Sequence, residues 1–281
     1  MRSGLQHLRI ACLQLGYPPG EPKTERVPRV VGLIAEAAVG ADLVVLPELW
    51  STGYFSFDRY AAEAELLQGQ TITTLRQTAS RHRIHLMAGT FVERHDQSLS
   101  NCAVLIGPDG NIMHTYRKVH LFGYESQESR LLTPGDDVTV VPTVMGTVGT
   151  TTCYDLRFPE LYRLLVDQGA RLIIVPAAWP AARLEHWQLL LRARALENQV
   201  VVVACNGAGP QEQTELAGHS MVVGPWGQIV AEAGGEEQIL RAELDLAEVE
   251  RVRMDFPVLD HRRIRVESLG SVPRVLPRPG G

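Results

Sequence analysis

The chain has 281 residues, of which 45% are hydrophobic and 21% are charged, and its formal net charge is −5. This composition is typical of a globular protein with one large domain or two small ones. The acidic balance argues against nucleic-acid binding, and no apolar run is long enough to span a bilayer. The first residues also lack the apolar segment and cleavage site of a secretory signal. We therefore expect a cytoplasmic protein without a nucleic-acid or membrane partner.

Hydrophobic patterning predicts alternating strands and helices in the first part of the chain. Strands are expected at residues 8–15, 41–48 and 84–93, and helices at residues 26–40 and 71–82. Residues 101–118 are typical of a β-hairpin, with Pro108-Asp109-Gly110 as its turn.

The second part continues the alternation and adds another hairpin. A β-prone run at 143–152 precedes Cys153, and apolar residues at helical spacing follow from about Pro159. Strands are then expected at 171–179 and 200–209, a helix at 184–199 and a hairpin at 218–234. Several strands are apolar on both faces, which is typical of sheets covered on both sides.

No internal repeat or linker divides the chain, so we expect one domain over residues 1–268. Residues 269–281 are rich in Pro, Gly and Arg. Such a tail is either disordered, which its composition favours, or extended along a neighbouring subunit.

The four cysteines differ in their surroundings. Cys12, Cys102 and Cys205 lie in short apolar runs, which favours buried, inert thiols. Cys153 instead lies at a turn between a strand and a helix start, where the helix dipole favours a thiolate. Taken alone, it fits a buried small hydrophobe equally well. None of the four has the spacing of a zinc ligand, so we expect no metal.

Two further candidate residues, like Cys153, lie at the ends of predicted strands. Glu48 directly follows an apolar strand and a proline, at the strand end where open α/β sheets bind ligands. Lys118 lies in an alternating run and faces the same side as Tyr116 and His120. Either residue alone is adequately explained as a solvated glutamate or as an edge-strand lysine.

Together, the carboxylate, the ammonium and the thiol suit one chemistry. The sulfur attacks a carbonyl or nitrile carbon, while the carboxylate takes the thiol proton and later passes it to the leaving amine. The ammonium and the backbone N–H after the nucleophile stabilise the oxyanion. This set of groups requires no metal and no organic cofactor.

Three segments resemble the nitrilase, or carbon–nitrogen hydrolase, superfamily: LPE ending at Glu48, YRKVHLF around Lys118 and CYDLRFPELYR from Cys153. They occur in the family's order, and ESRLLTPGD, RALENQ and GHSMVVGPWG also look like family segments. The resemblance extends from LRIACLQL to about Leu269. It implies an α-β-β-α sandwich that dimerises to αββα-αββα, often within larger assemblies.

The resemblance also implies residue roles. Glu48 would be the general base, Lys118 the oxyanion stabiliser and Cys153 the nucleophile, and the backbone N–H of Tyr154 would complete the oxyanion hole. Many members carry a second glutamate ahead of the PGD segment, and Glu128 fits that position. Glu125 lies close by and could be the second glutamate instead of Glu128. The segment between Lys118 and Glu128 is shorter than in many amidases of the family.

The resemblance implies hydrolysis of a small amide with release of ammonia through a thioester. Nitriles and N-carbamoyl compounds are alternatives, because the same three groups serve them. The CYDLRFPE segment is most similar to ω-amidases and amidases of deaminated glutathione. Arg157 could bind a substrate carboxylate or, equally well, form an ion pair with Glu160 or Asp155. Tyr54 could line the pocket mouth, although a packing role is the simpler interpretation.

Two hypotheses from other classes remain open at this point. One is a papain-like Cys–His enzyme with His120 or His114 as the base. The other is a non-catalytic binding module that has kept all three groups.

Overall fold

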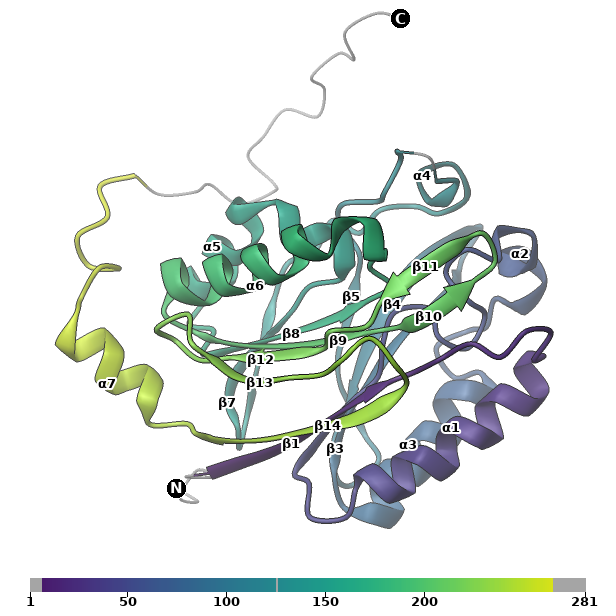
Figure 1. The fold of residues 1–281 in the computed structure, drawn as a ribbon, viewed down its shortest axis with the longest axis horizontal. Coiled ribbons are helices and arrows are strands. Elements are labelled where there is room, and N and C mark those ends of the chain that lie inside the picture. The colour runs from purple at the N-terminus through teal and green to yellow at the C-terminus, as the bar shows by residue number, and fades with distance from the viewer. Residues whose placement is uncertain (1–6, 125, 265–281) are drawn as a thin grey trace, which may run out of the picture.

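Two six-stranded sheets form the centre of the molecule (Figure 1). The computed structural model describes residues 7–124 and 126–264. The strands of the first sheet are, in spatial order, β14 (Gln238–Asp245), β1 (His7–Gln14), β2 (Leu43–Val45), β3 (His85–His95), β4 (Ser98–Ile106) and β5 (Ile112–Arg117). β1, β2 and β3 are parallel, and the outer pairs are antiparallel.

The second sheet repeats this plan. Its strands are, in spatial order, β13 (Ile229–Glu232), β12 (Met221–Val223), β9 (Val201–Asn206), β8 (Leu172–Ala177), β7 (Gly146–Thr150) and β6 (Val140–Thr143). Again three central strands, β7, β8 and β9, are parallel and the outer pairs are antiparallel. A separate two-stranded ribbon is formed by β10 (Ala208–Gln211) and β11 (Thr214–Ala217).

Helices cover the outer face of each sheet, as Figure 1 shows. α1 (Lys23–Ala37) and α3 (Gln70–His82) pack on the first sheet, and α5 (Pro159–Asp167) and α6 (Leu184–Asn198) pack on the second. The shorter elements are η1 (Phe57–Arg59), α2 (Tyr60–Glu63), α4 (Glu128–Leu131), η2 (Cys153–Arg157), η3 (Ala181–Arg183) and α7 (Glu248–Asp255). The predicted α-β-β-α sandwich is confirmed.

The alternation of side chains along each strand explains why the strands are apolar on both faces. In β1, Ile10 and Cys12 belong to the core between the two sheets, whereas Ala11 and Leu13 belong to the core under α1 and α3. Because side chains on a strand alternate between faces, a strand in a middle layer must present apolar groups to both.

The helices and strands predicted before residue 235 are present, with ends shifted by a few residues. Two elements near the C-terminal end were not predicted. β14 is a charged edge strand that alternates exposed and buried residues, and α7 buries only Val249 and Val252. Both depend on contacts with the rest of the fold, because their own sequences carry weak apolar patterns.

The boundary proposed at residue 268 and the tail at 269–281 lie outside the described residues. Dimerisation stays a prediction. Among the helices of the described residues, none is both long and apolar enough to cross a bilayer.

Candidate active site

Glu48, Lys118 and Cys153 converge at the ends of strands from both sheets. Glu48 lies shortly after β2, Lys118 directly follows β5, and Cys153 begins η2 after β7. The Ala178 amide donates to Glu48 Oε2 at 3.0 Å, and the Glu48 amide donates to the Ala177 carbonyl at 3.2 Å. These two bonds fasten the glutamate of the first sheet to the end of β8 in the second.

The backbone is left-handed at two of the positions that form the site. φ is 44° at Leu49, directly after the glutamate, and 45° at Cys153. This conformation costs a residue other than glycine roughly 1–2 kcal/mol. At Leu49 it is stabilised by a hydrogen bond from the Leu49 amide to Thr90 Oγ1, at 2.8 Å. The surrounding contacts therefore hold both reactive groups in strained turns.

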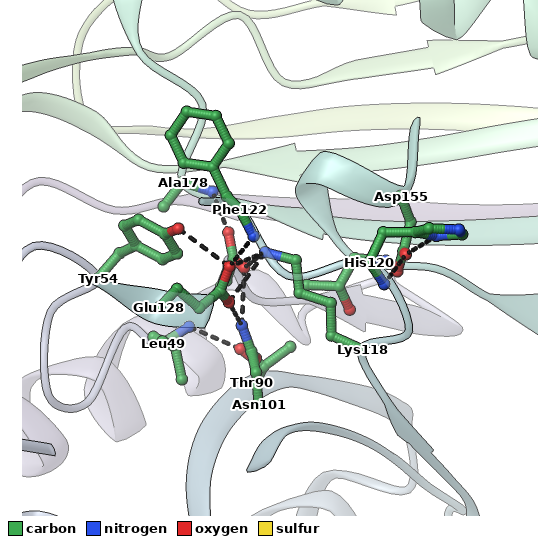
Figure 2. A network of polar contacts seen from close by, with 12 residues as sticks. Leu49, Tyr54, Thr90, Asn101, Lys118, His120, Phe122, Glu128, Asp155 and Ala178 are labelled. Carbon is green, nitrogen blue, oxygen red and sulfur yellow. Dashed lines mark hydrogen bonds and ion pairs between the residues drawn. The ribbon is translucent and has the colours of Figure 1, made fainter. Parts of the chain in front are cut away.

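The Lys118 ammonium lies between two carboxylates (Figure 2). Its Nζ is 2.8 Å from Glu48 Oε1, and 3.0 Å and 2.9 Å from the two oxygens of Glu128. The side chain has no exposed surface. Burial disfavours the ammonium, but Glu128 and Glu48 outweigh this effect and raise the pKa of Lys118 above its ordinary value. The site thus contains a fixed positive charge.

Glu128, at the start of α4, is held by several donors besides Lys118 (Figure 2). Its Oε2 accepts a hydrogen bond from the Phe122 amide at 2.7 Å and one from the Tyr54 hydroxyl at 3.1 Å. Glu128 is fully buried, as the sequence interpretation requires, whereas Glu125 lies outside the described residues. Tyr54 is therefore more than a packing aromatic, because its hydroxyl fixes this carboxylate.

Asn101 is part of the same network and was missed from the sequence. Its Nδ2 donates to Glu48 Oε1 and to Glu128 Oε1, both at 2.8 Å. The residue is fully buried in β4, and its Oδ1 has no hydrogen-bond partner within the described residues. Asn101 therefore acts as a donor that bridges the two carboxylates. Its motif, SNCAVLI, resembles an ordinary buried strand and gave no signal.

The surroundings of Cys153 favour the neutral thiol over the thiolate. Burial raises the pKa of Cys153 well above its ordinary value, and the Glu48 charge adds to the increase, while Lys118 and the Ala178 amide oppose it. The expectation that a helix N-terminus favours the thiolate is wrong. Cys153 begins η2, a short 3-10 turn, and the longer helix α5 begins only at Pro159. The thiol therefore needs a base.

Glu48 is the carboxylate in contact with that thiol. Burial raises the pKa of Glu48, Lys118 lowers it and Glu128 raises it again, and a hydrogen bond with Cys153 favours the charged form. The net direction is upward. A carboxylate with a raised pKa beside a buried thiol is suited to receive and return a proton.

Asp155 joins the cysteine turn to the lysine segment. Its buried carboxylate accepts hydrogen bonds from the Thr152 amide at 3.0 Å, the Tyr116 hydroxyl at 2.7 Å and the His120 amide at 2.9 Å. The His120 ring also contacts Asp155, with 2.8 Å between Nδ1 and Oδ1, and stacks on Phe158. These contacts assign His120 to the support of the site, and the charged side chains that act on the Cys153 thiol are Glu48 and Lys118.

Cys153 lies in the wall of a small pocket. The other lining residues are Tyr54, Phe55, Phe122, Tyr154, Arg157, Ala178, Trp179, Pro180 and Arg183. Aromatic and apolar side chains make up most of the lining, and two guanidinium groups supply the charge. The pocket therefore suits a small molecule with an anionic group.

The ion pairs expected for Arg157 as an alternative are not formed. Among the described residues, Arg157 has no salt bridge to a carboxylate, and Asp155 is occupied by Tyr116 and His120. Instead the Arg157 guanidinium stacks over the Trp179 ring at 4.7 Å and contacts His186 Nδ1 at 3.3 Å. Arg157 is therefore available to a ligand in the pocket.

Comparisons with known proteins agree with this geometry. Residues 9–254 match the Carbon-nitrogen hydrolase family. The chain belongs to the carbon–nitrogen hydrolase family. It is 40% identical over 265 residues to the 2-oxoglutaramate amidase of Paenarthrobacter nicotinovorans, covering 91% of this chain and 90% of that protein. It is 36% identical over 269 residues to human omega-amidase NIT2, and the match covers 91% of this chain and 95% of that protein.

A solved structure gives the same result for the fold. The crystal structure of Saccharomyces cerevisiae Nit3, a member of the nitrilase superfamily, matches this hydrolase with a TM-score of 0.85. The two chains are 35% identical, and the match covers 94% of this chain and 99% of Nit3. The family resemblance is confirmed, and the carbon–nitrogen hydrolase is an amidase. The non-catalytic alternative thereby loses its basis.

The donor set of this amidase resembles no metal site. Within residues 7–124 and 126–264, no group of three or more His, Cys, Asp or Glu side chains is arranged to hold a metal ion. The two buried carboxylates instead share one ammonium, that of Lys118, and are bridged by Asn101.

Replacing Asn101 with leucine, which has a similar volume, is expected to lower kcat by about 10- to 100-fold. Glu48 and Glu128 would each lose a buried donor, at a cost of roughly 1–3 kcal/mol. Steady-state kinetics and thermal unfolding measure the two effects. Asn111→Leu, in the exposed turn between β4 and β5, is the matched control. Unchanged kcat in Asn101→Leu would show that the bridge has no role in the reaction.

Proposed function

We propose that this amidase hydrolyses the ω-amide of a small dicarboxylic acid, with Cys153 as nucleophile, Glu48 as general base and Lys118 as oxyanion stabiliser. The observation that carries the proposal is the buried set in which Glu48 contacts both the Lys118 ammonium and the Cys153 thiol. That set opens onto a small pocket that also contains Arg157. Relatives named 2-oxoglutaramate amidase and omega-amidase support this substrate class.

The first half of the reaction forms a thioester. Glu48 removes the thiol proton as the Cys153 sulfur attacks the amide carbon, and the negative charge moves onto the carbonyl oxygen. The Lys118 ammonium and the backbone N–H of Tyr154 stabilise that oxyanion. When the C–N bond breaks, Glu48 returns its proton to the nitrogen and ammonia leaves.

The second half regenerates the enzyme. Glu48 takes a proton from water as the water oxygen attacks the thioester carbon, and Lys118 again stabilises the oxyanion. The C–S bond breaks, the proton returns to the sulfur of Cys153, and the free carboxylic acid leaves. One amide and one water give one acid and one ammonia, so atoms and charges balance.

Glu128 has a supporting part in the proposal. It accepts hydrogen bonds from the ammonium of Lys118 and from the hydroxyl of Tyr54. Because Glu48 alternates between its charged and neutral forms in this proposal, the contacts of both Glu128 oxygens with Nζ hold Lys118 in place throughout the reaction.

The acidic end of the substrate is assigned to Arg157. Its guanidinium lines the pocket together with Cys153, and its stacking on Trp179 leaves the N–H groups that do not contact His186 available to a carboxylate. In this pocket the amide would lie at the sulfur of Cys153 and the acid at Arg157. Tyr54 completes the wall on the Glu128 side.

A substrate panel tests the proposal. We expect ammonia release from 2-oxoglutaramate and glutaramate with a kcat/KM at least about tenfold above that for nitriles or N-carbamoyl amino acids of equal length. An assay of released ammonia across the panel measures the ratios. A preference for nitriles or carbamoyl compounds would replace the proposed substrate class and leave the nucleophile unchanged.

A cytoplasmic location and a homodimer stay predictions, and sedimentation of the purified protein tests the latter.

A further inference from the structure

A second guanidinium, that of Arg183, lies at the pocket and has no part in the steps above. Arg183 ends η3, directly before α6, and lines the pocket with Cys153 and Arg157. The residue is half-buried. The sequence gave no signal for it, because it lies between an alanine pair and a helix start and resembles a loop arginine.

The guanidinium of Arg183 is held by aromatic faces. Its central carbon lies 5.7 Å from the ring centroid of Phe122 and 5.7 Å from that of Tyr124. Aromatic faces stabilise a cation without occupying its N–H groups, which lie in the plane of the guanidinium. Within residues 7–124 and 126–264, the Arg183 side chain has no ion pair and no hydrogen bond to a carboxylate. Its donors are therefore available.

Trp179 connects this arginine to Arg157. The face of the Trp179 ring supports the Arg157 guanidinium, while its indole Nε1 donates to the Arg183 carbonyl at 2.8 Å. The amide of Arg183 in turn donates to the Pro180 carbonyl at 3.0 Å. One buried tryptophan thus fixes the positions of both arginines in the wall of the same pocket.

The positive charges of Arg157 and Arg183 repel each other. Burial lowers the pKa of Arg157, and the charge of Arg183 lowers it further, while Tyr154 and Cys153 oppose the shift. Two like charges beside a small apolar cavity are unfavourable unless an anion enters. A bound carboxylate would satisfy both guanidiniums and relieve the repulsion.

We propose that Arg183 is a specificity-determining residue that joins Arg157 in binding the acidic end of the substrate. The proposal rests on the proposed function and deepens it. A single arginine tolerates a neutral polar end group, whereas a pair favours a full negative charge. The amidase thereby selects monoamides of dicarboxylic acids over uncharged amides of the same length.

The test compares two substrates in three variants. Glutaramate carries an acid at the far end, and pentanamide has the same chain length without it. We expect Arg183→Ala to lower the ratio of kcat/KM for glutaramate to that for pentanamide by about tenfold or more, mainly through KM for glutaramate. Arg183→Lys keeps the charge but loses the planar guanidinium. Its ratio should lie between those of the wild type and Arg183→Ala. Arg81→Ala, on the exposed side of α3, removes an equal charge and should leave the ratio unchanged.

The outcomes separate this inference from the proposed function. An unchanged ratio in Arg183→Ala, with a wild-type enzyme that prefers glutaramate, overturns the role of Arg183 alone. Equal losses on both substrates would also overturn it, since they indicate a structural role. A wild-type enzyme that prefers pentanamide overturns the proposed function itself.

Discussion

Replacement of Cys153 with alanine is expected to abolish ammonia release, with kcat lowered by at least about a thousandfold. No other thiol can substitute, because Cys12, Cys102 and Cys205 lie in the cores and do not line the pocket. The fold should persist, since alanine and cysteine bear similar costs at the left-handed φ of 45°. Steady-state kinetics and a thermal unfolding curve measure the two effects.

Mass spectrometry gives the control for this variant. Wild-type enzyme quenched during turnover should carry an acyl group on the peptide that contains Cys153, and Cys153→Ala should carry none. Ammonia release at the wild-type rate by Cys153→Ala, or an acyl group on another residue, would show that the nucleophile is misassigned.

Replacement of Glu48 with glutamine is expected to lower kcat by about 10²- to 10⁴-fold, the usual range for the loss of a general base. The amide keeps the shape of the carboxylate but cannot accept the thiol proton. The effect should be large because burial keeps the Cys153 pKa well above its ordinary value, so few thiolates form without the base. A plot of log kcat/KM against pH should lose its acidic limb and rise only as the thiol ionises.

Glu65→Gln is the matched control for that variant. Glu65 also pairs with a lysine, with 2.6 Å between its Oε1 and Lys23 Nζ, but it lies on the α2–α3 connection and does not line the pocket. Its replacement should change stability by a small amount and leave kcat unchanged. Full activity in Glu48→Gln would instead favour a histidine base and revive the Cys–His hypothesis, in which His120 or His114 is the base.

Local sequence pointed to three candidate residues of the site, and the family resemblance then gave their expected roles. Each of Glu48, Lys118 and Cys153 lies at the end of an apolar or alternating run. Such strand ends can be identified in a sequence because Pro and polar residues mark them. Glu128 came from family resemblance rather than from local pattern. Asn101 and Arg183 could not be predicted, because their roles depend on partners from distant elements.

The sequence by itself determined the alternation of buried strands and covering helices and the identity of the thiol, carboxylate and ammonium. Hydrophobic periodicity and turn-forming residues are local properties of the chain, so they can be recognised without knowing the fold. Only the tertiary structure decided the raised pKa of Cys153, the sharing of Lys118 between two carboxylates and the placement of Arg157 and Arg183 in one pocket. Burial and charge–charge distances determine these properties, and both arise when segments remote in the chain pack together.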